Sequence, residues 1–147
     1  MGKLVSQTEI KSNGDVFHEL WGSKPHHIPK ISPDKVQGCD LHKGEWGTVG
    51  SVIFWNYVHD GKAKVAKEVI DGIDEKNKTV IFRAIEGDLL ELYKSFVATL
   101  HVDTKGGNNL VTWTFEYEKR SEDVEDPNSL MDFAVNLTKD IETHHLK

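Results

Sequence analysis

"VIFWNYVHDGKAKVAKEVI", residues 52–70, is the stretch that decides the fold of this chain. Asp60 and Gly61 lie in it between two extended runs of apolar and β-branched residues. An Asp-Gly pair in this setting is the strongest short signal of a β-hairpin in the chain. We therefore predict two antiparallel strands that meet at this turn.

The alternation of strand and turn continues on both sides of this hairpin. Strand-like sequence begins at Lys35, and turn-rich segments at 74–78, 86–93 and 105–109 separate the later runs. Residues 4–11 form a further predicted strand at the start of the chain. Because no helical crossover separates consecutive strands, we predict an antiparallel meander and exclude a parallel doubly wound sheet.

Two short helices are predicted between the first and the second strand. Apolar residues recur at helical spacing in "DVFHELWG", residues 15–22, where the final glycine is a stop signal. Residues 23–33 contain three of the four prolines of the chain. We therefore expect only a short helix there, near residues 26–30.

A long amphipathic helix is predicted at residues 129–144. At 1.5 Å per residue it is about 25 Å long. Pro127 precedes it, and Asn128 or Ser129 can cap its first turn. Its apolar stripe consists of Leu130, Ala134, Leu137 and Ile141, with Phe133 beside them.

The faces of the strands predict a curved sheet around a cavity. In residues 111–117, aromatic and aliphatic residues alternate strictly with polar ones, so one face of that strand is apolar. About seven strands spaced 4.8 Å apart make a sheet roughly 34 Å wide, whereas a helix is only about 10–12 Å across. The sheet must therefore curl around its single long helix, and the space left inside is typical of a small-molecule site. The alternative, in which the aromatic side chains simply pack on one another and on the helix, stays open at this point.

We interpret the inward residues of this α+β architecture as candidate contacts of an apolar ligand. Phe54, on the opposite face from Trp55 and Tyr57, weakens the assignment of that strand. The first helix contributes Phe17 and Trp21, the strands contribute Trp55, Tyr57, Val65, Phe82, Ala98, Leu100, Trp113, Phe115 and Tyr117, and the last helix contributes Leu130, Phe133, Ala134 and Leu137.

The glycine-rich segment "GEWGTVGS", residues 44–51, invites comparison with a phosphate-binding loop. A Walker loop requires a lysine before its final hydroxyl residue, but Ser51 directly follows Gly50. The segment also precedes a predicted strand, whereas a phosphate loop opens onto a helix. We therefore interpret Gly44, Gly47 and Gly50 as turn residues.

Composition limits the partners and the compartment. The formal net charge of −6 argues against a nucleic-acid surface and against ribonuclease activity. The single cysteine, Cys39, fits a reducing compartment, and we expect a cytoplasmic protein of one domain, residues 1–147. The chain has no stretch long enough to span a membrane, so no integral membrane association is expected. "MGKLVS" does match the pattern for myristoylation of Gly2, although a lead into the first strand is the preferred interpretation.

Titratable residues give a weaker signal. The histidine pairs at 26–27 and 144–145 lack the spacing of a zinc site, so we expect no metal and no cofactor. His18 and His101 are expected to be solvated. Of Glu45, Glu68, Asp71, Glu86 and Asp88, Glu68 stands out because it lies between apolar residues midway along a strand. The solvent face is its favoured position, but a buried Glu68 would be a candidate acid or base.

The order of elements and several long motifs resemble a known family. "GEWGTVGSVIFWNYVHDGKAKVAKE", "TVIFRAIEGDLLELYKSF", "WTFEYEK" and "LTKDIETHHL" are similar to the hallmark stretches of the plant major latex protein family. That family belongs to the birch-pollen-allergen or pathogenesis-related class 10 superfamily, and the resemblance covers essentially the whole chain.

The resemblance implies a helix-grip fold and a soluble plant protein of defence and stress responses. It further implies an internal cavity that binds hydrophobic molecules such as hormones, flavonoids, fatty acids, sterols or alkaloids. A few superfamily members are enzymes of alkaloid biosynthesis, so a cavity enzyme acting on alkaloid-like metabolites is the alternative, with Glu68 or Tyr57 as its acid or base. We expect a monomer or a weak dimer.

Overall fold

The residues that the structure describes form one antiparallel sheet of seven strands. The structure is a computed structural model and describes residues 2–11, 13–105 and 108–144. The strands follow the order β1-β7-β6-β5-β4-β3-β2 across the sheet, which confirms the predicted meander with β1 returning beside β7. Their bounds are β1 Gly2–Ile10, β2 Val36–Lys43, β3 Val52–His59, β4 Lys62–Asp74, β5 Thr79–Gly87, β6 Tyr93–Lys105 and β7 Asn108–Lys119.

Helices occur where the periodicity predicts them. Asn13 caps the first helix, because its Oδ1 accepts hydrogen bonds of 2.8 Å from the amide of Asp15 and 3.2 Å from that of Val16. The segment 86–93, expected only as a connection, contains one additional helical turn. The bounds are α1 Gly14–Ser23, the 3₁₀ turn η1 Pro25–His27, α2 Ile28–Ile31, α3 Leu89–Leu92 and α4 Asn128–His144.

The hairpin between β3 and β4 has the predicted two-residue turn. Asp60 and Gly61 have φ angles of 54° and 74°, the left-handed conformation that a tight hairpin turn of this kind requires. His59 and Lys62 pair directly on either side of it. This turn therefore fixes which residues of β3 and β4 lie opposite one another.

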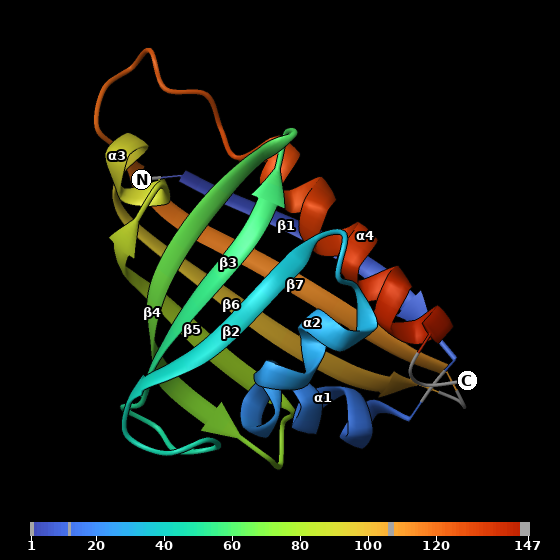
Figure 1. Ribbon diagram of the computed structural model, residues 1–147. Coiled ribbons are helices and arrows are strands. Elements are labelled where there is room, and N and C mark those ends of the chain that lie inside the picture. The colour runs from blue at the N-terminus through green and yellow to red at the C-terminus, as the bar shows by residue number, and fades with distance from the viewer. Residues whose placement is uncertain (1, 12, 106–107, 145–147) are drawn as a thin grey trace.

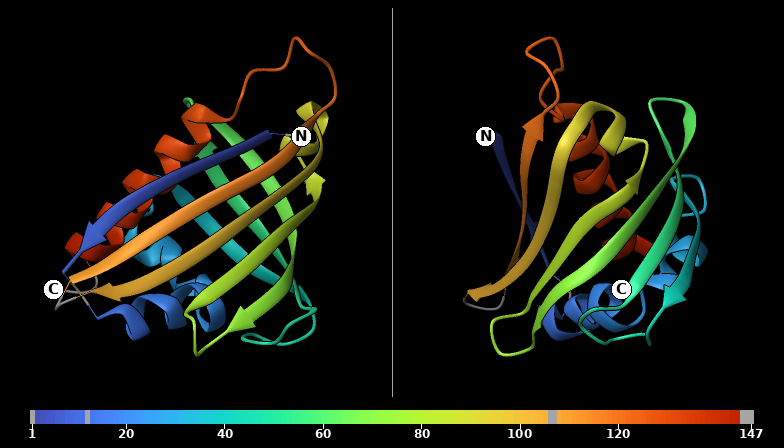
Figure 2. Two further views of the ribbon diagram at one scale, coloured as in Figure 1. Left: turned by 180° about the vertical axis from the view of Figure 1, so that it is seen from behind. Right: turned by 90° about the vertical axis from the view of Figure 1, so that its left-hand side faces the viewer.

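The sheet curves around α4, as the mismatch between sheet width and helix diameter predicts. Figure 1 shows α4 running along the open side of the curved sheet, while α1 and α2 lie together at one end. The two views of Figure 2 show the same arrangement from behind and from the side. The apolar faces of the sheet and of α4 therefore enclose a common interior.

His18 is buried, and the expectation that it is solvated is wrong. Only 6% of its surface is exposed, and its Nε2 lies 3.2 Å from the carbonyl oxygen of Thr79 at the start of β5. The side chain of Thr79 also contacts His101, with 3.0 Å between Oγ1 and Nδ1. The polar side of α1 thus packs against the N-terminal end of β5. There the backbone carbonyl of Thr79 is the hydrogen-bond partner of the His18 imidazole.

The glycine-rich segment is a turn between β2 and β3, as predicted. Gly44, Gly47 and Gly50 all have positive φ angles, of 88°, 82° and 93°. The buried Ser51 hydroxyl donates a 2.6 Å hydrogen bond to the carbonyl oxygen of Glu45 and accepts one of 3.0 Å from its amide. Ser51 therefore closes the loop internally instead of serving an external anion.

Candidate ligand-binding cavity

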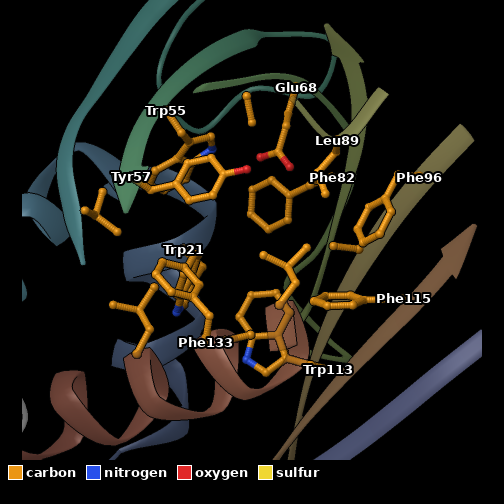
Figure 3. A pocket seen from close by; sticks show the side chains of 16 residues that line it. Trp21, Trp55, Tyr57, Glu68, Phe82, Leu89, Phe96, Trp113, Phe115 and Phe133 are labelled. Atoms are coloured by element: carbon orange, nitrogen blue, oxygen red, sulfur yellow. The ribbon is translucent and has the colours of Figure 1, made fainter. Parts of the chain in front are cut away.

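A cavity of about 110 Å³ lies between the concave face of the sheet and α4. Figure 3 shows its aromatic wall, to which α1, the sheet and α4 all contribute. Most of the sequence-predicted contacts are brought together here: Trp21, Trp55, Tyr57, Phe82, Ala98, Trp113, Phe115, Leu130, Phe133, Ala134 and Leu137. These residues come from α1, from the inner face of the sheet and from α4.

Four predicted contacts do not line the cavity. Phe17, Leu100 and Tyr117 are almost completely buried, but they pack in the core outside the cavity wall. Val65 lies on the opposite face of β4, because its neighbour Ala66 lines the cavity. The placement of Val65 inside was therefore wrong.

The cavity wall also contains residues that the sequence-based list omitted: Val36, Ala66, Glu68, Leu89 and Phe96. Phe96 shares the inner face of β6 with Ala98, so strand alternation was a sufficient signal for it. Ala66 pairs directly with Trp55, and directly paired residues lie on the same face of a sheet. Leu89 lies in α3, for which the sequence carried no signal.

Glu68 faces the cavity, not the solvent, which corrects its favoured assignment. Its carboxylate lies among the aromatic side chains (Figure 3). Burial raises the pKa of Glu68 to about 7. The indole N–H of Trp55 is close enough to oppose this rise in pKa, although it makes no hydrogen bond of normal geometry. Glu68 is therefore a titratable group in an apolar site.

Several buried donors in the wall have no hydrogen-bond partner among the residues that the structure describes. These are the hydroxyl of Tyr57 and the indole N–H groups of Trp21 and Trp55. Burial, followed by the charges of Glu68 and Asp88, raises the pKa of Tyr57, so its hydroxyl stays protonated. Trp113 differs from them because its indole N–H donates a 2.9 Å hydrogen bond to the Thr138 hydroxyl. Buried polar groups are normally paired, so the unpaired donors mark positions where a ligand can bind.

Other kinds of site find little support among the described residues. Within them, no three histidine, cysteine, aspartate or glutamate side chains are grouped so as to hold a metal ion. Cys39 is buried, and burial raises the pKa of its thiol, which makes it unreactive. A search of the helices in the described residues finds none with the length and hydropathy of a transmembrane span.

The chain is similar to known proteins of one family. The model of the pathogenesis-related protein Bet v 1 family matches residues 1–147. MLP-like protein 43 of Arabidopsis thaliana is 45% identical, over 99% of this chain and 94% of that protein. MLP-like protein 28 of the same plant is 51% identical over 99% of this chain, which spans only 44% of the length of that relative.

Solved structures show the same fold. Ginseng major latex-like protein 151 from Panax ginseng superposes with a TM-score of 0.97 and 59% identity, covering 99% of this chain and 98% of that one. Norcoclaurine synthase from Thalictrum flavum, at 19% identity and a TM-score of 0.74 over 99% of this chain and 89% of that one, shares the fold alone. The chain therefore belongs to the pathogenesis-related protein Bet v 1 family, among its major latex-like proteins.

Proposed function

We propose that the protein binds a small hydrophobic molecule in the cavity between the sheet and α4. The observation that supports this most directly is the wall itself, in which aromatic side chains surround space and leave buried donors unpaired. A protein interior is normally packed without voids larger than a water molecule, so a cavity of about 110 Å³ is unusual for a core that serves stability alone. Hormone-, sterol-, flavonoid- and fatty-acid-like molecules are the ligand classes in question.

The size of the cavity limits how such a ligand binds. Typical small-molecule sites have volumes of roughly 300–1,000 Å³. An apolar cavity of about 150 Å³ takes up benzene. The cavity of about 110 Å³ is smaller than that, so a ligand with one or more rings must displace wall side chains. We expect the α4 side chains, such as that of Phe133, to move when it binds.

The biological role that we propose is that of a carrier or store for such molecules in plant defence and stress responses. The protein is proposed to act in the cytoplasm as a monomer or a weak dimer. The Bet v 1 family fold and the major latex-like relatives support this role.

A dye titration tests the binding site. A polarity-sensitive dye such as 8-anilinonaphthalene-1-sulfonate should brighten on binding, and Ala98→Trp should abolish this response because the new indole fills the cavity. Thr99→Trp is the matched control, because it adds the same side chain on the outer face of β6. An equal dye response in the two variants, or no response in the unsubstituted protein, contradicts the proposal.

Glu68 supports a second candidate function, a cavity enzyme acting on alkaloid-like metabolites. A carboxyl group with a pKa of about 7 in an apolar site can accept and return a proton near neutral pH. The hydroxyl of Tyr57 points toward it in Figure 3. In this case Glu68→Gln and Tyr57→Phe should each lower turnover while dye binding persists. Full turnover in both variants would show that neither Glu68 nor Tyr57 is the acid or base of such an enzyme.

A further inference from the structure

One end of the cavity gathers a hydroxyl, a carboxylate and an indole N–H, whereas elsewhere in the wall the polar atoms are the indole N–H groups of Trp21 and Trp113. The Tyr57 hydroxyl, the Glu68 carboxylate and the indole of Trp55 lie together at this end in Figure 3. They come from the adjacent strands β3 and β4. Tyr57 and Trp55 are only 6% and 7% exposed, and neither polar atom has a hydrogen-bond partner within the described chain. We call Trp55, Tyr57 and Glu68 the polar end.

The polar end offers both donors and an acceptor. The indole of Trp55 can only donate a hydrogen bond, whereas the hydroxyl of Tyr57 can donate and accept. At pH values above its pKa of about 7, the Glu68 carboxylate is ionised and can only accept. A ligand group that satisfies this set must therefore accept a hydrogen bond from Trp55 or Tyr57 and donate one to Glu68.

Among the described residues, no basic side chain lines the cavity to neutralise Glu68. The lining residues include no lysine, arginine or histidine. The side chain of the nearby Asp88 accepts a 2.7 Å hydrogen bond from the amide of Val65, so it is engaged elsewhere. On the outer face of β4, Lys67 pairs with Glu86 at 3.5 Å. The hydrogen-bonding capacity of Glu68 is thus left to whatever occupies the cavity.

We propose that the ligand is an apolar molecule carrying an uncharged hydroxyl group, which binds at the polar end between Trp55, Tyr57 and Glu68. This inference rests on the proposed function, because it requires that the cavity is a ligand site. The hydroxyl oxygen accepts a hydrogen bond from Trp55 or Tyr57, and the hydroxyl O–H donates a hydrogen bond to the Glu68 carboxylate. The apolar body of the ligand lies against Phe82 and Phe115.

Other functional groups fit the polar end less well. A ketone can only accept, so its oxygen would face the Glu68 carboxylate without a proton between them. An ammonium group can only donate, so the indole N–H of Trp55 would stay unpaired. It would also bring a second ion into an apolar site, and desolvation of both ions offsets much of their attraction. A hydrocarbon leaves all three residues of the polar end unsatisfied.

A series of probes with one carbon skeleton tests this assignment. Indane, 1-indanol, 1-indanone and 1-aminoindane differ only in their polar group, and the amine is protonated at neutral pH. Their dissociation constants are measured at pH 8, above the pKa of Glu68 of about 7, by calorimetry or by displacement of the dye. We expect 1-indanol to bind about tenfold more tightly than indane, the effect of one or two net hydrogen bonds. The ketone and the amine should bind more weakly than the alcohol.

Variants locate the preference at the polar end. The ratio of the 1-indanol and indane affinities is compared within each variant, so general effects on stability or cavity size cancel. The double variant Tyr57→Phe/Glu68→Leu should bring this ratio close to one. Glu86→Gln is the matched control, because it removes a carboxylate that pairs with Lys67 outside the cavity and should leave the ratio near ten.

The outcomes separate this inference from the proposed function. If indane binds but 1-indanol binds no more tightly, the cavity is a ligand site and the hydroxyl assignment is wrong. Tighter binding of 1-aminoindane, or equal binding of 1-indanone and 1-indanol, also overturns the assignment. If none of the four probes binds, the proposed function fails and this inference fails with it.

Discussion

The indole N–H of Trp113 donates a 2.9 Å hydrogen bond to the hydroxyl of Thr138, both fully inside the protein. This bond joins β7 to α4 through the wall of the cavity. The same hydroxyl donates a 2.9 Å bond to the carbonyl oxygen of Ala134, one turn earlier in α4. Thr138 thus holds the helix in a fixed orientation over the sheet.

Thr138→Val should lower the free energy of unfolding by about 1–3 kcal/mol, because it leaves the Trp113 indole N–H buried without a partner. Valine has nearly the same shape as threonine, so the packing is preserved. Thr138→Ser is the control, since it keeps the hydroxyl and loses only a methyl group. Urea denaturation measures both variants. A valine variant as stable as the original protein would show that the bond contributes nothing.

Glu68 should make stability depend on pH. Its pKa is raised to about 7 in the folded protein, from an ordinary value of 4.5. Between these values the folded state holds a proton that the unfolded state has lost, so stability falls as pH rises from 4.5 and levels off above about 7. The shift corresponds to a loss on the order of 3 kcal/mol.

Glu68→Gln should remove this slope, because glutamine does not titrate. Unfolding free energies measured by urea denaturation at several pH values between 4.5 and 8 check the prediction. Glu86→Gln, a carboxylate on the outer side of β5 beside Lys67, is the control and should keep the slope. A slope unchanged in the Glu68 variant would mean that Glu68 is solvated.

The order of helices and strands could be predicted from local sequence signals. The Asp-Gly turn, the prolines between β1 and β2, and the helical period of residues 129–144 each act within a few residues. Such signals need no knowledge of distant contacts. The curvature of the sheet could also be predicted, because it follows from the number of apolar strands and the size of a single helix.

The orientation of β4 was harder to predict. Val65 and Val69 lie on one face of this strand and Ala66 and Glu68 on the other, so neither face is clearly more apolar. The hairpin register contains the missing information. A two-residue turn at Asp60 places Ala66 opposite Trp55 and Glu68 opposite Ile53, which puts both on the inner face. The burial of His18 had no such signal, because it depends on how α1 docks on β5.

Substitutions on β4 test this orientation. Ala66→Trp should abolish the dye response, because its side chain points into the cavity. Val65→Trp, the adjacent position, should leave the response within about twofold of the original, since its indole lies on the outer face. Fluorescence titration at equal protein concentration compares the two. The opposite pattern would place Val65 inside and reverse the assignment of the strand.

Alanine substitutions at two glycines of the glycine-rich loop distinguish the effect of backbone strain on stability from that of a steric clash. Gly44 and Gly50 have nearly equal φ angles of 88° and 93°. A Cβ atom at Gly44 would lie 2.4 Å from the Ser51 hydroxyl oxygen, whereas at Gly50 nothing lies within 4 Å. Gly50→Ala should therefore cost only the left-handed strain, about 1–2 kcal/mol. Gly44→Ala should cost more, because it also displaces the hydroxyl that holds Glu45.

Thermal and urea unfolding of the two variants give the comparison. Ser51→Ala in the Gly44→Ala background provides the control, because removing the hydroxyl oxygen relieves the closest contact. If Ser51 holds the loop, Gly44→Ala should lower the free energy of unfolding less when Ser51 is already alanine. The remaining loss should then approach that of Gly50→Ala, which is due to backbone strain. If Gly44→Ala and Gly50→Ala lower the free energy of unfolding equally, the Ser51 hydroxyl can move aside without loss of stability. The loop would then be held mainly by the 2.8 Å hydrogen bond from the Gly50 amide to the Ile70 carbonyl oxygen.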